Sequence, residues 1–425
     1  MMKIMKFGAV PPEEIFARAV PEIDVSAVVA DIIQNVRSRG DAALLEYNEK
    51  FEKAKLTALE ISPAEMEAAL AATDPAFVAI LERAAANIRA FHARQKREGF
   101  RMDLDGRVLG QKVLPIEKVG LCVPGGVTPL SSTVLMDAIP AKIAGCAELT
   151  MVTPPRADGT IDASILAAAR VAGVDRVFKI GGAQAVAALA YGTESVPKVD
   201  KIVGPGGAFV AEAKRQVFGR VSIDMIAGPS EVLVLADGNS DPAWVAADLL
   251  SQAEHDKLAA AVLVTDSEAL AEAVQAEIER QLPQLVREEI ARASIDRNGK
   301  IIVTDDLSAA VDVANAIAPE HLELCVEDPF AWLDRIQNAG SVFLGRNCPE
   351  ALGDYYAGAN HTLPTSGTAR FSSPLSVDDF VKKTQYIYYG EDALLKAVDD
   401  VAAFARQEGL TGHARSVTIR KEKLT

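Results

Sequence analysis

The sequence has few of the residues on which many functional sites depend. Its 425 residues include five histidines, four cysteines and two tryptophans. The cysteines form no CxxC pair, which argues against a cysteine zinc cluster and against a disulfide scaffold. We expect free thiols in a cytoplasmic compartment, each packed as a small hydrophobe rather than acting as a nucleophile.

Long apolar runs and an excess of positive charge are also missing. No uninterrupted apolar stretch approaches the roughly 20 residues of a membrane span, and the opening MMKIMKFGAVPPEEIF lacks the apolar core of a signal peptide. The net charge is −15, so the field of the chain repels phosphate backbones and anionic membrane surfaces. These features predict no nucleic-acid partner and no membrane partner.

Three motifs of cofactor and metal chemistry are absent as well. Neither GxGxxG nor GxxxxGK[ST] occurs, so the usual nucleotide fingerprints are missing. The absence of HExxH excludes the metallopeptidase arrangement. Glycine pairs end several predicted strands, at 125–126, 181–182 and 206–207. Phosphate binding and simple tight turns explain these pairs equally well.

Short apolar strands alternate with alanine-rich helices from about residue 110 to 346, as in KVGLCVPGG, ELTMVTPP and EVLVLADG. This alternation predicts mainly parallel α/β sheets covered on both faces. The length favours two or three domains. Apolar spacing predicts a helix over 25–39, and a second, alanine-rich helical region is expected from about 64 to 97. After the sheets we expect a functional loop over 347–371, a short aromatic strand, and a tail of one helix followed by a turn.

Four of the five histidines lie in polar, turn-rich or helix-end segments, most with acidic neighbours. A helix places an amide and an imidazole about one turn apart on one face, and an adjacent Glu–His pair supplies both partners for proton transfer near neutral pH. Solvated surface groups remain the alternative for each. The side chains are Gln252 and His255; Glu320 and His321; Asp354 and His361; Glu408 and His413.

The remaining histidine, His92, lies among basic residues in ARQKREGF and its flanks, which predicts a solvated basic face. Two imidazoles with a carboxylate and an amide oxygen suit a divalent cation, and zinc accepts His and Asp ligands at about 2.0 to 2.2 Å. Zinc is therefore the first candidate, with manganese or cobalt as alternates.

Together these motifs resemble the L-histidinol dehydrogenase family, whose members catalyse the last steps of histidine biosynthesis. The matching stretches follow the family's order and span nearly the whole chain from about residue 115 to 415. They are VPGG with PLSSTVLM, GGAQAVAALAYGTESVPKVDKIVGPG, IDMIAGPSEVLV, DLLSQAEHD, APEHLEL, GDYYAGANHTLPTSGTARFSSPLSVDDFVKK and EGLTGHA.

The resemblance implies two successive NAD-dependent oxidations, from L-histidinol through an enzyme-held aldehyde to L-histidine. His321 corresponds to the group that takes the alcohol proton, and Glu320 to the group that activates water for addition to the aldehyde. In the family one zinc ligand comes from the partner chain of an intertwined homodimer, here His413. The zinc ligands correspond to Gln252, His255, Asp354 and His413; substrate contacts correspond to these four with Ser230, His321, His361 and Glu408.

At the family's nucleotide site the chain departs at two of three positions. Gln184 matches, but Cys122 stands where the family usually has Tyr, and Gly207 stands where it usually has Asn. Loss of an aromatic face and of an amide weakens dinucleotide binding, by about 1 kcal/mol or more each where the groups are desolvated.

The resemblance also implies two incomplete Rossmann-like α/β domains with small terminal extensions that intertwine in a homodimer. The expected ranges are an N-terminal extension at 1–21, a zinc domain of 22–122 with 231–371, a nucleotide domain at 123–230 and a tail at 372–425 that contributes to the partner's site. The alternatives are a paralogous dehydrogenase for another small polar alcohol, a non-catalytic relative that binds metal or ligand, and a zinc hydrolase that needs no NAD.

Overall fold

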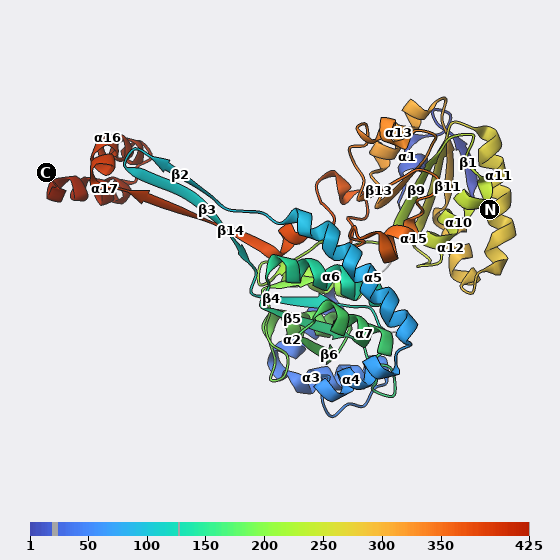
Figure 1. The fold of residues 1–425 in the computed structure, drawn as a ribbon, viewed down its shortest axis with the longest axis horizontal. Coiled ribbons are helices and arrows are strands. Elements are labelled where there is room, and N and C mark those ends of the chain that lie inside the picture. Colours follow the sequence, from blue (N-terminus) through green and yellow to red (C-terminus); the bar gives the residue numbers. More distant parts are fainter. Residues whose placement is uncertain (19–23, 126–127, 425) are drawn as a thin grey trace. The chain divides into compact units, whose positions relative to one another are not determined.

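The chain is built around two parallel sheets and one antiparallel sheet (Figure 1). The described residues form two compact units, and both parallel sheets belong to the first of them. The expected α/β fold with mainly parallel sheets is therefore confirmed. The computed structural model describes residues 1–18, 24–125 and 128–424. The units are Met1–Gln95 with Ile116–Phe380, and Lys96–Pro115 with Val381–Thr425.

The larger parallel sheet has the strand order β1-β11-β10-β9-β12-β13. Its central strands β9 and β12 are buried at every residue, as expected for parallel strands that helices cover on both faces. One face packs on α10, α11 and α12, and the other on α13. The elements are β1 (Lys3–Lys6), α1 (Pro12–Phe16), β9 (Glu231–Ala236), α10 (Pro242–Ala253), β10 (Ala260–Thr265), α11 (Glu268–Gln281), α12 (Glu288–Asn298), β11 (Lys300–Val303), α13 (Leu307–Ile317), β12 (His321–Cys325), α14 (Pro329–Leu333), β13 (Ser341–Leu344) and α15 (Glu350–Leu352).

The second parallel sheet has the order β6-β5-β4-β7-β8. Helices α5, α6 and α7 contribute to the core on one face, and α2, α3 and α8 to the core on the other. Gly126, at one of the expected glycine turns, lies outside the described residues. The elements are α2 (Ser26–Arg39), α3 (Asp41–Tyr47), α4 (Pro63–Ala72), α5 (Pro75–His92), β4 (Lys118–Cys122), α6 (Ser131–Ala144), β5 (Glu148–Thr153), α7 (Ala163–Ala172), β6 (Arg176–Lys179), α8 (Gly182–Tyr191), β7 (Lys201–Val203), α9 (Ala208–Val217) and β8 (Ser222–Ile223).

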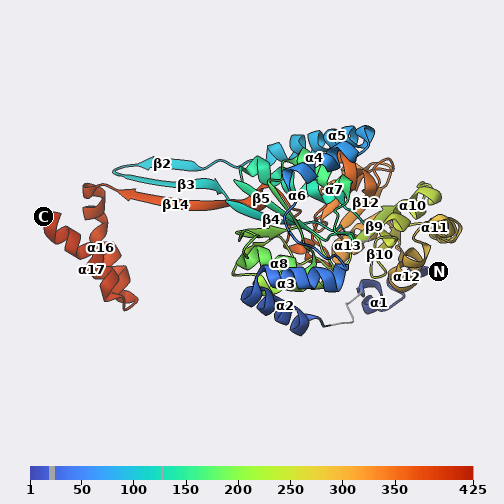
Figure 2. The same cartoon turned by 90° about the horizontal axis from the view of Figure 1, so that it is seen from below.

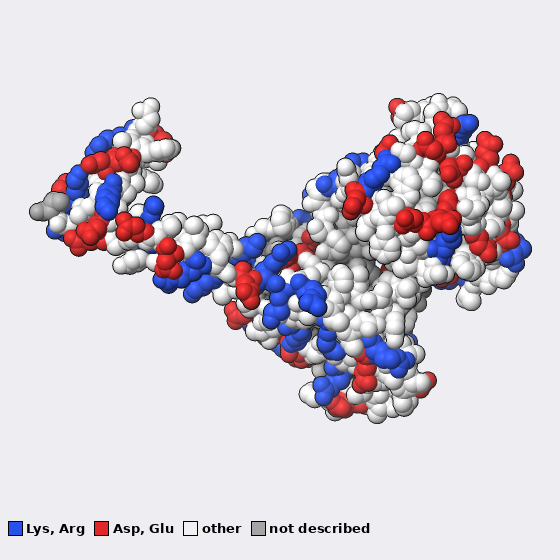
Figure 3. All heavy atoms as spheres, turned by 45° about the horizontal axis from the view of Figure 1, so that its top comes forward, with Lys and Arg blue, Asp and Glu red and all other residues white. Residues whose placement is uncertain are grey.

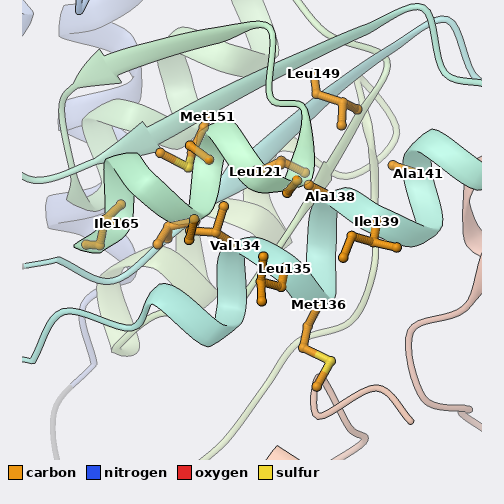
Figure 4. Packing of buried hydrophobic residues seen from close by; sticks show 14 of the residues in the cluster. Leu121, Val134, Leu135, Met136, Ala138, Ile139, Ala141, Leu149, Met151 and Ile165 are labelled. Carbon is orange, nitrogen blue, oxygen red and sulfur yellow. The ribbon is translucent and has the colours of Figure 1, made fainter. Parts of the chain in front are cut away.

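Helix α6 packs buried apolar side chains against this sheet (Figure 4), with Leu135 only 2% exposed. Leu135→Ala is expected to lower the free energy of unfolding by about 2 to 5 kcal/mol, because it removes buried contacts and leaves a cavity. Val28→Ala, on the half-exposed face of α2, should change it by less than about 0.5 kcal/mol. Denaturant unfolding of both variants measures the difference, and equal midpoints would contradict this account of the core.

The second unit is an antiparallel sheet of order β14-β3-β2 followed by two helices, as Figure 2 shows. Residues 381–389 pair along the whole length of β3. The elements are β2 (Phe100–Leu104), β3 (Arg107–Pro115), β14 (Val381–Tyr389), α16 (Glu391–Gln407) and α17 (Thr411–Leu424).

The helical region expected over about 64–97 is present as two helices, because Asp74 caps α5 and Pro75 cannot continue α4. The prediction for the tail was wrong. The tail holds two helices rather than one helix and a turn, with Gly409 between them at a φ of +75°. The hairpin of β2 and β3 was not predicted, although FRMDL at β2 alternates apolar and polar residues; the strand is exposed at all five of them.

The elements are distributed differently from the expected domain ranges. Residues 26–92 lie with the second sheet through α2, α3 and α5, rather than with the zinc domain. Residues 3–6 of the expected N-terminal extension form an edge strand of the larger sheet. Within the described parts of the chain, no helix is long and apolar enough to cross a membrane.

Candidate active site

The site is organised around Glu231, Glu320 and His321 at the amino edge of the larger sheet. His321 is the first residue of β12 and is 4% exposed, and Glu320 directly precedes it. The carbonyl oxygen of Glu231 lies 3.0 Å from His321 Nδ1, and the N–H of Glu231 donates to Glu320 Oε2 at 2.8 Å. Because a carbonyl only accepts, Nδ1 carries a proton, and in the neutral ring Nε2 is the nitrogen that accepts one. One backbone position thus orients both side chains of the expected proton-transfer pair.

Three carboxylates surround the His321 imidazole. Glu320 and Glu350 lie 3.6 and 3.8 Å from Nδ1, and Asp354 lies 3.5 Å from Nε2. Burial alone would lower the pKa of His321, but the charges of Glu350, Glu320 and Asp354 outweigh it and raise the pKa well above its usual value. The same surroundings stabilise an imidazolium at this position.

The carboxylates differ from one another in their ionisation. Burial raises the pKa of Glu320 to about 8 and that of Glu350 to about 7, with His321 opposing the shift in both cases. Burial also acts to raise the pKa of Asp354, but the imidazoles of His321, His361 and His255 outweigh it and lower that pKa. Asp354 is therefore the carboxylate of the three that stays ionised most readily.

Gln252 lies in the last turn of α10 and is 1% exposed. Its amide is satisfied when Nε2 faces Glu350, donating to Oε1 and, at 3.1 Å, to Oε2. His255 lies just beyond the helix end, where its backbone N–H donates to the carbonyl of Gln252 at 3.2 Å. The side chain of His255 is exposed at its surface. Desolvation by the surrounding protein nevertheless lowers its pKa, and the charge of Asp354 acts in the opposite direction.

His361 joins the two sheets at the site. Its Nδ1 lies 3.1 Å from the carbonyl oxygen of Asp354, and its Nε2 lies 3.4 Å from Thr133 Oγ1 in the first turn of α6. Burial lowers the pKa of His361. Ser230 directly precedes β9, and its carbonyl accepts the N–H of Ala260 at 3.0 Å. His361 therefore lies beside Asp354 of the expected substrate site, and Ser230 directly precedes Glu231.

Glu408 and His413, the expected contributions from the tail, belong to the second unit. Glu408 ends α16, and His413 lies in the first turn of α17. Both are exposed. The structure thus separates them by unit from the first three expected zinc donors.

The three expected nucleotide contacts lie at the carboxyl edge of the second sheet. Cys122 ends β4, Gln184 lies in the first turn of α8, and Gly207 precedes α9. Cys122 and Gln184 are buried. A Cβ added at Gly207 would meet no atom within 4 Å, so the fold leaves room there for a larger side chain.

The sequence analysis missed Glu350, which is 2% exposed and contacts both Gln252 and His321. Donor atoms of His321, Glu350 and Asp354 lie within 4.8 Å of one another, a grouping that could hold a cation. The available signal was the spacing in PEALGD, because Glu350 precedes Asp354 by four residues and helical geometry brings such positions together.

The solvated position expected for His92 was wrong. Its side chain is fully buried, with Nδ1 2.6 Å from Gln95 Oε1 and Nε2 3.5 Å from Asn360 Nδ2. Burial lowers the pKa of His92. The neighbouring Arg and Lys residues suggested solvent, but α5 turns this one position inward.

The four cysteines are free thiols, and none lies in an activating environment. Burial raises the pKa of Cys122 to about 12 and that of Cys146 to about 11, and it also raises the pKa of Cys325 and of Cys348. A thiolate nucleophile is disfavoured at all four positions. Serine at all four should leave turnover within about threefold in steady-state assays of folded protein, because no thiol takes part. Loss of turnover on changing one cysteine alone would indicate a thiohemiacetal mechanism instead.

The fold consists of two parallel sheets covered by helices, and a buried imidazole lies among carboxylates and other donor groups. This arrangement defines an α/β enzyme built for proton transfer. The sequence profile described as "Histidinol dehydrogenase" matches residues 17–421. The chain belongs to the histidinol dehydrogenase family, which confirms the resemblance and the expected dehydrogenase class.

Individual relatives agree over nearly the full chain. The histidinol dehydrogenase of Geobacillus kaustophilus is 56% identical over 93% of each chain, and that of Syntrophotalea carbinolica is 54% identical over 99% of each. The crystal structure of histidinol dehydrogenase from Elizabethkingia anophelis superposes with a TM-score of 0.94 at 38% identity, covering 100% of this chain and 98% of that one.

Proposed function

We propose that this enzyme oxidises L-histidinol through L-histidinal to L-histidine in the cytoplasm, with NAD as oxidant and zinc holding the substrate. The observation that carries the proposal is the Glu231 backbone, which orients both Glu320 and His321 beside the expected donors. Four free cysteines fit a reducing compartment. The chemistry divides between two NAD-dependent steps, of which only the second consumes water.

The zinc donors fit the metal by their protonation states. A lowered pKa keeps His255 neutral, which is the form that ligates, and a lowered pKa keeps Asp354 ionised. With its nitrogen toward Glu350, Gln252 presents its oxygen as a donor. Zinc bound to these groups and to His413 would supply a fixed cation that holds the amino and imidazole groups of the substrate.

His321 is placed to take the alcohol proton at Nε2, since Nδ1 is committed to the carbonyl of Glu231. Nε2 is buried and faces Asp354 at 3.5 Å without forming a hydrogen bond among the described residues, so it lies among the groups of the expected substrate site. Glu320 is placed to activate water for the second oxidation. Closure of this buried site would retain the aldehyde between steps.

The carboxyl edge of the second sheet is the proposed nucleotide site. Gln184, Cys122 and Gly207 all lie at that edge, where open parallel sheets bind ligands. Thr133 at the same edge contacts His361, so the edge adjoins the substrate groups. The open space at Gly207 supports weaker dinucleotide binding than an amide side chain would give.

A second copy of the chain is the proposed source of Glu408 and His413. The second unit exposes large apolar side chains that a monomer would leave in water, which is typical of an interaction surface. Figure 3 shows uncharged surface of this unit lying between its charged groups. The exposed residues include Phe100, Met102, Ile387, Tyr388, Phe404 and Leu410.

One coupled measurement tests the proposed activity. Purified protein should contain zinc and form NADH from histidinol, and chelation should abolish turnover that zinc then restores. Full activity of metal-free protein would contradict the zinc role. No NAD binding by calorimetry at millimolar nucleotide would favour the non-catalytic alternative, and a faster reaction with another small polar alcohol would favour the paralogue.

Co-expression of two inactive variants tests the shared site. In a mixed dimer of His255→Asn and His413→Asn chains, one site carries both changes and the other carries neither. Random pairing should therefore recover about a quarter of the wild-type activity, since half the dimers have one intact site of two. Activity no greater than that of the separate variants would show that each tail serves its own chain.

A further inference from the structure

Glu350 is the buried carboxylate that the proposed reaction leaves without a role. It is 2% exposed and begins α15, while Gln252 lies in the last turn of α10, so two distant segments meet at this contact. The backbone N–H of Glu350 donates to Glu323 Oε1 at 2.7 Å. This bond fixes the main chain that carries the Glu350 carboxylate. Burial of a carboxylate costs free energy, so a group with no other task would be replaced by an apolar one at little loss.

The contact decides which way the Gln252 amide points. With Nε2 toward Glu350, the amide donates to both carboxylate oxygens. In the opposite orientation the amide oxygen would face the carboxylate and repel it. The ionised carboxylate accepts only, whereas an amide at position 350 would accept or donate and so permit both orientations of Gln252.

We infer that Glu350 is a positioning residue that locks the Gln252 amide with its oxygen directed to the zinc. The inference rests on the proposed function, because it takes Gln252 as a metal donor. Outer carboxylates that orient metal ligands change metal affinity by about 10- to 100-fold when altered. Glu350 does not reach the substrate in this role, and its effect appears first in metal binding.

Zinc affinity of Glu350→Gln, measured by competition with a chromophoric chelator, tests the inference without any assay of turnover. The variant keeps the side-chain volume, and its dissociation constant for zinc should rise about 10- to 100-fold while circular dichroism shows native folding. Glu350→Asp restores an acceptor-only group and should recover at least about threefold of that loss. If Glu350→Gln fails to fold, Glu350→Asp tests the inference instead. Its dissociation constant for zinc should exceed that of wild type by about threefold or more, because the shorter side chain withdraws the carboxylate from Gln252.

Asp248→Asn is the matched control. Asp248 lies on α10 one turn before Gln252, and this change neutralises a half-buried carboxylate there. Its zinc affinity should stay within about twofold of wild type. The inference is overturned if Gln252→Ala weakens zinc binding but Glu350→Gln binds zinc with wild-type affinity. It is also overturned if Glu350→Asp recovers none of the affinity that Glu350→Gln loses. If Gln252→Ala and His255→Asn both bind zinc normally, the proposed ligand set itself fails.

Discussion

Replacing His255 by Asn is expected to remove the bound zinc and to lower kcat by at least about 100-fold, the upper end of losses from altered outer partners of a metal. The imidazole is held in its neutral, ligating form beside Asp354. Asparagine is shorter and carries no ring nitrogen, so one donor of the set is lost. Metal content after gel filtration and the rate of NADH formation from histidinol measure the two effects.

Glu254→Gln serves as the control because it changes the charge in the same turn and leaves the imidazole. That variant should keep its zinc and most of its activity. Retention of a full complement of metal by His255→Asn would contradict the ligand role directly. Loss of activity with metal retained would instead place His255 at the substrate.

Glu320→Gln is expected to slow the oxidation of histidinal by about 10² to 10⁴-fold while slowing the oxidation of histidinol far less. Glutamine keeps an oxygen that accepts the N–H of Glu231, so the geometry is preserved and the base is lost. Only the aldehyde step consumes water. Starting the reaction separately from alcohol and from aldehyde distinguishes the steps, and equal losses in both would contradict the division of roles.

The pH dependence of the aldehyde step follows from the same residue. Burial raises the pKa of Glu320 to about 8, so the carboxylate is mostly protonated at pH 7 and ionises as the pH rises. A general base acts only when ionised, and the rate of histidinal oxidation should therefore rise with pH through about 8. In Glu320→Gln this rise should disappear, because no group titrates at that position.

The sequence predicted the strands of the parallel sheets well because they are buried on both faces and appear as short apolar runs. The stretches ELTMVT at β5 and EVLVLA at β9 were expected and are present, with all but one of their residues buried. The hairpin of the second unit was missed although FRMDL at β2 alternates apolar and polar residues, because five residues make a short pattern that no buried run reinforces. His92 was misjudged because its charged neighbours on α5 point outward while the imidazole points inward.

At the site, residue chemistry alone singled out Gln252, His255, Asp354 and the pair Glu320 and His321, since amides, imidazoles and carboxylates stand out in an alanine-rich chain. The structure gathers these five at one edge of the larger sheet. Gln252 and His255 were expected to share a helix face, but α10 ends at Ala253 and His255 lies beyond it. His413 and Glu408 belong to the other unit.

The amino-acid sequence by itself determined the α/β class, the family and the side chains able to do the chemistry, because apolar periodicity and residue type are local properties. Only the tertiary structure decided that Glu231 orients both Glu320 and His321 through its backbone, and that Glu350 meets Gln252. These contacts join residues about 90 to 100 positions apart. Parallel pairing of β9 with β12 creates the first, and no local pattern along the chain records such a pairing.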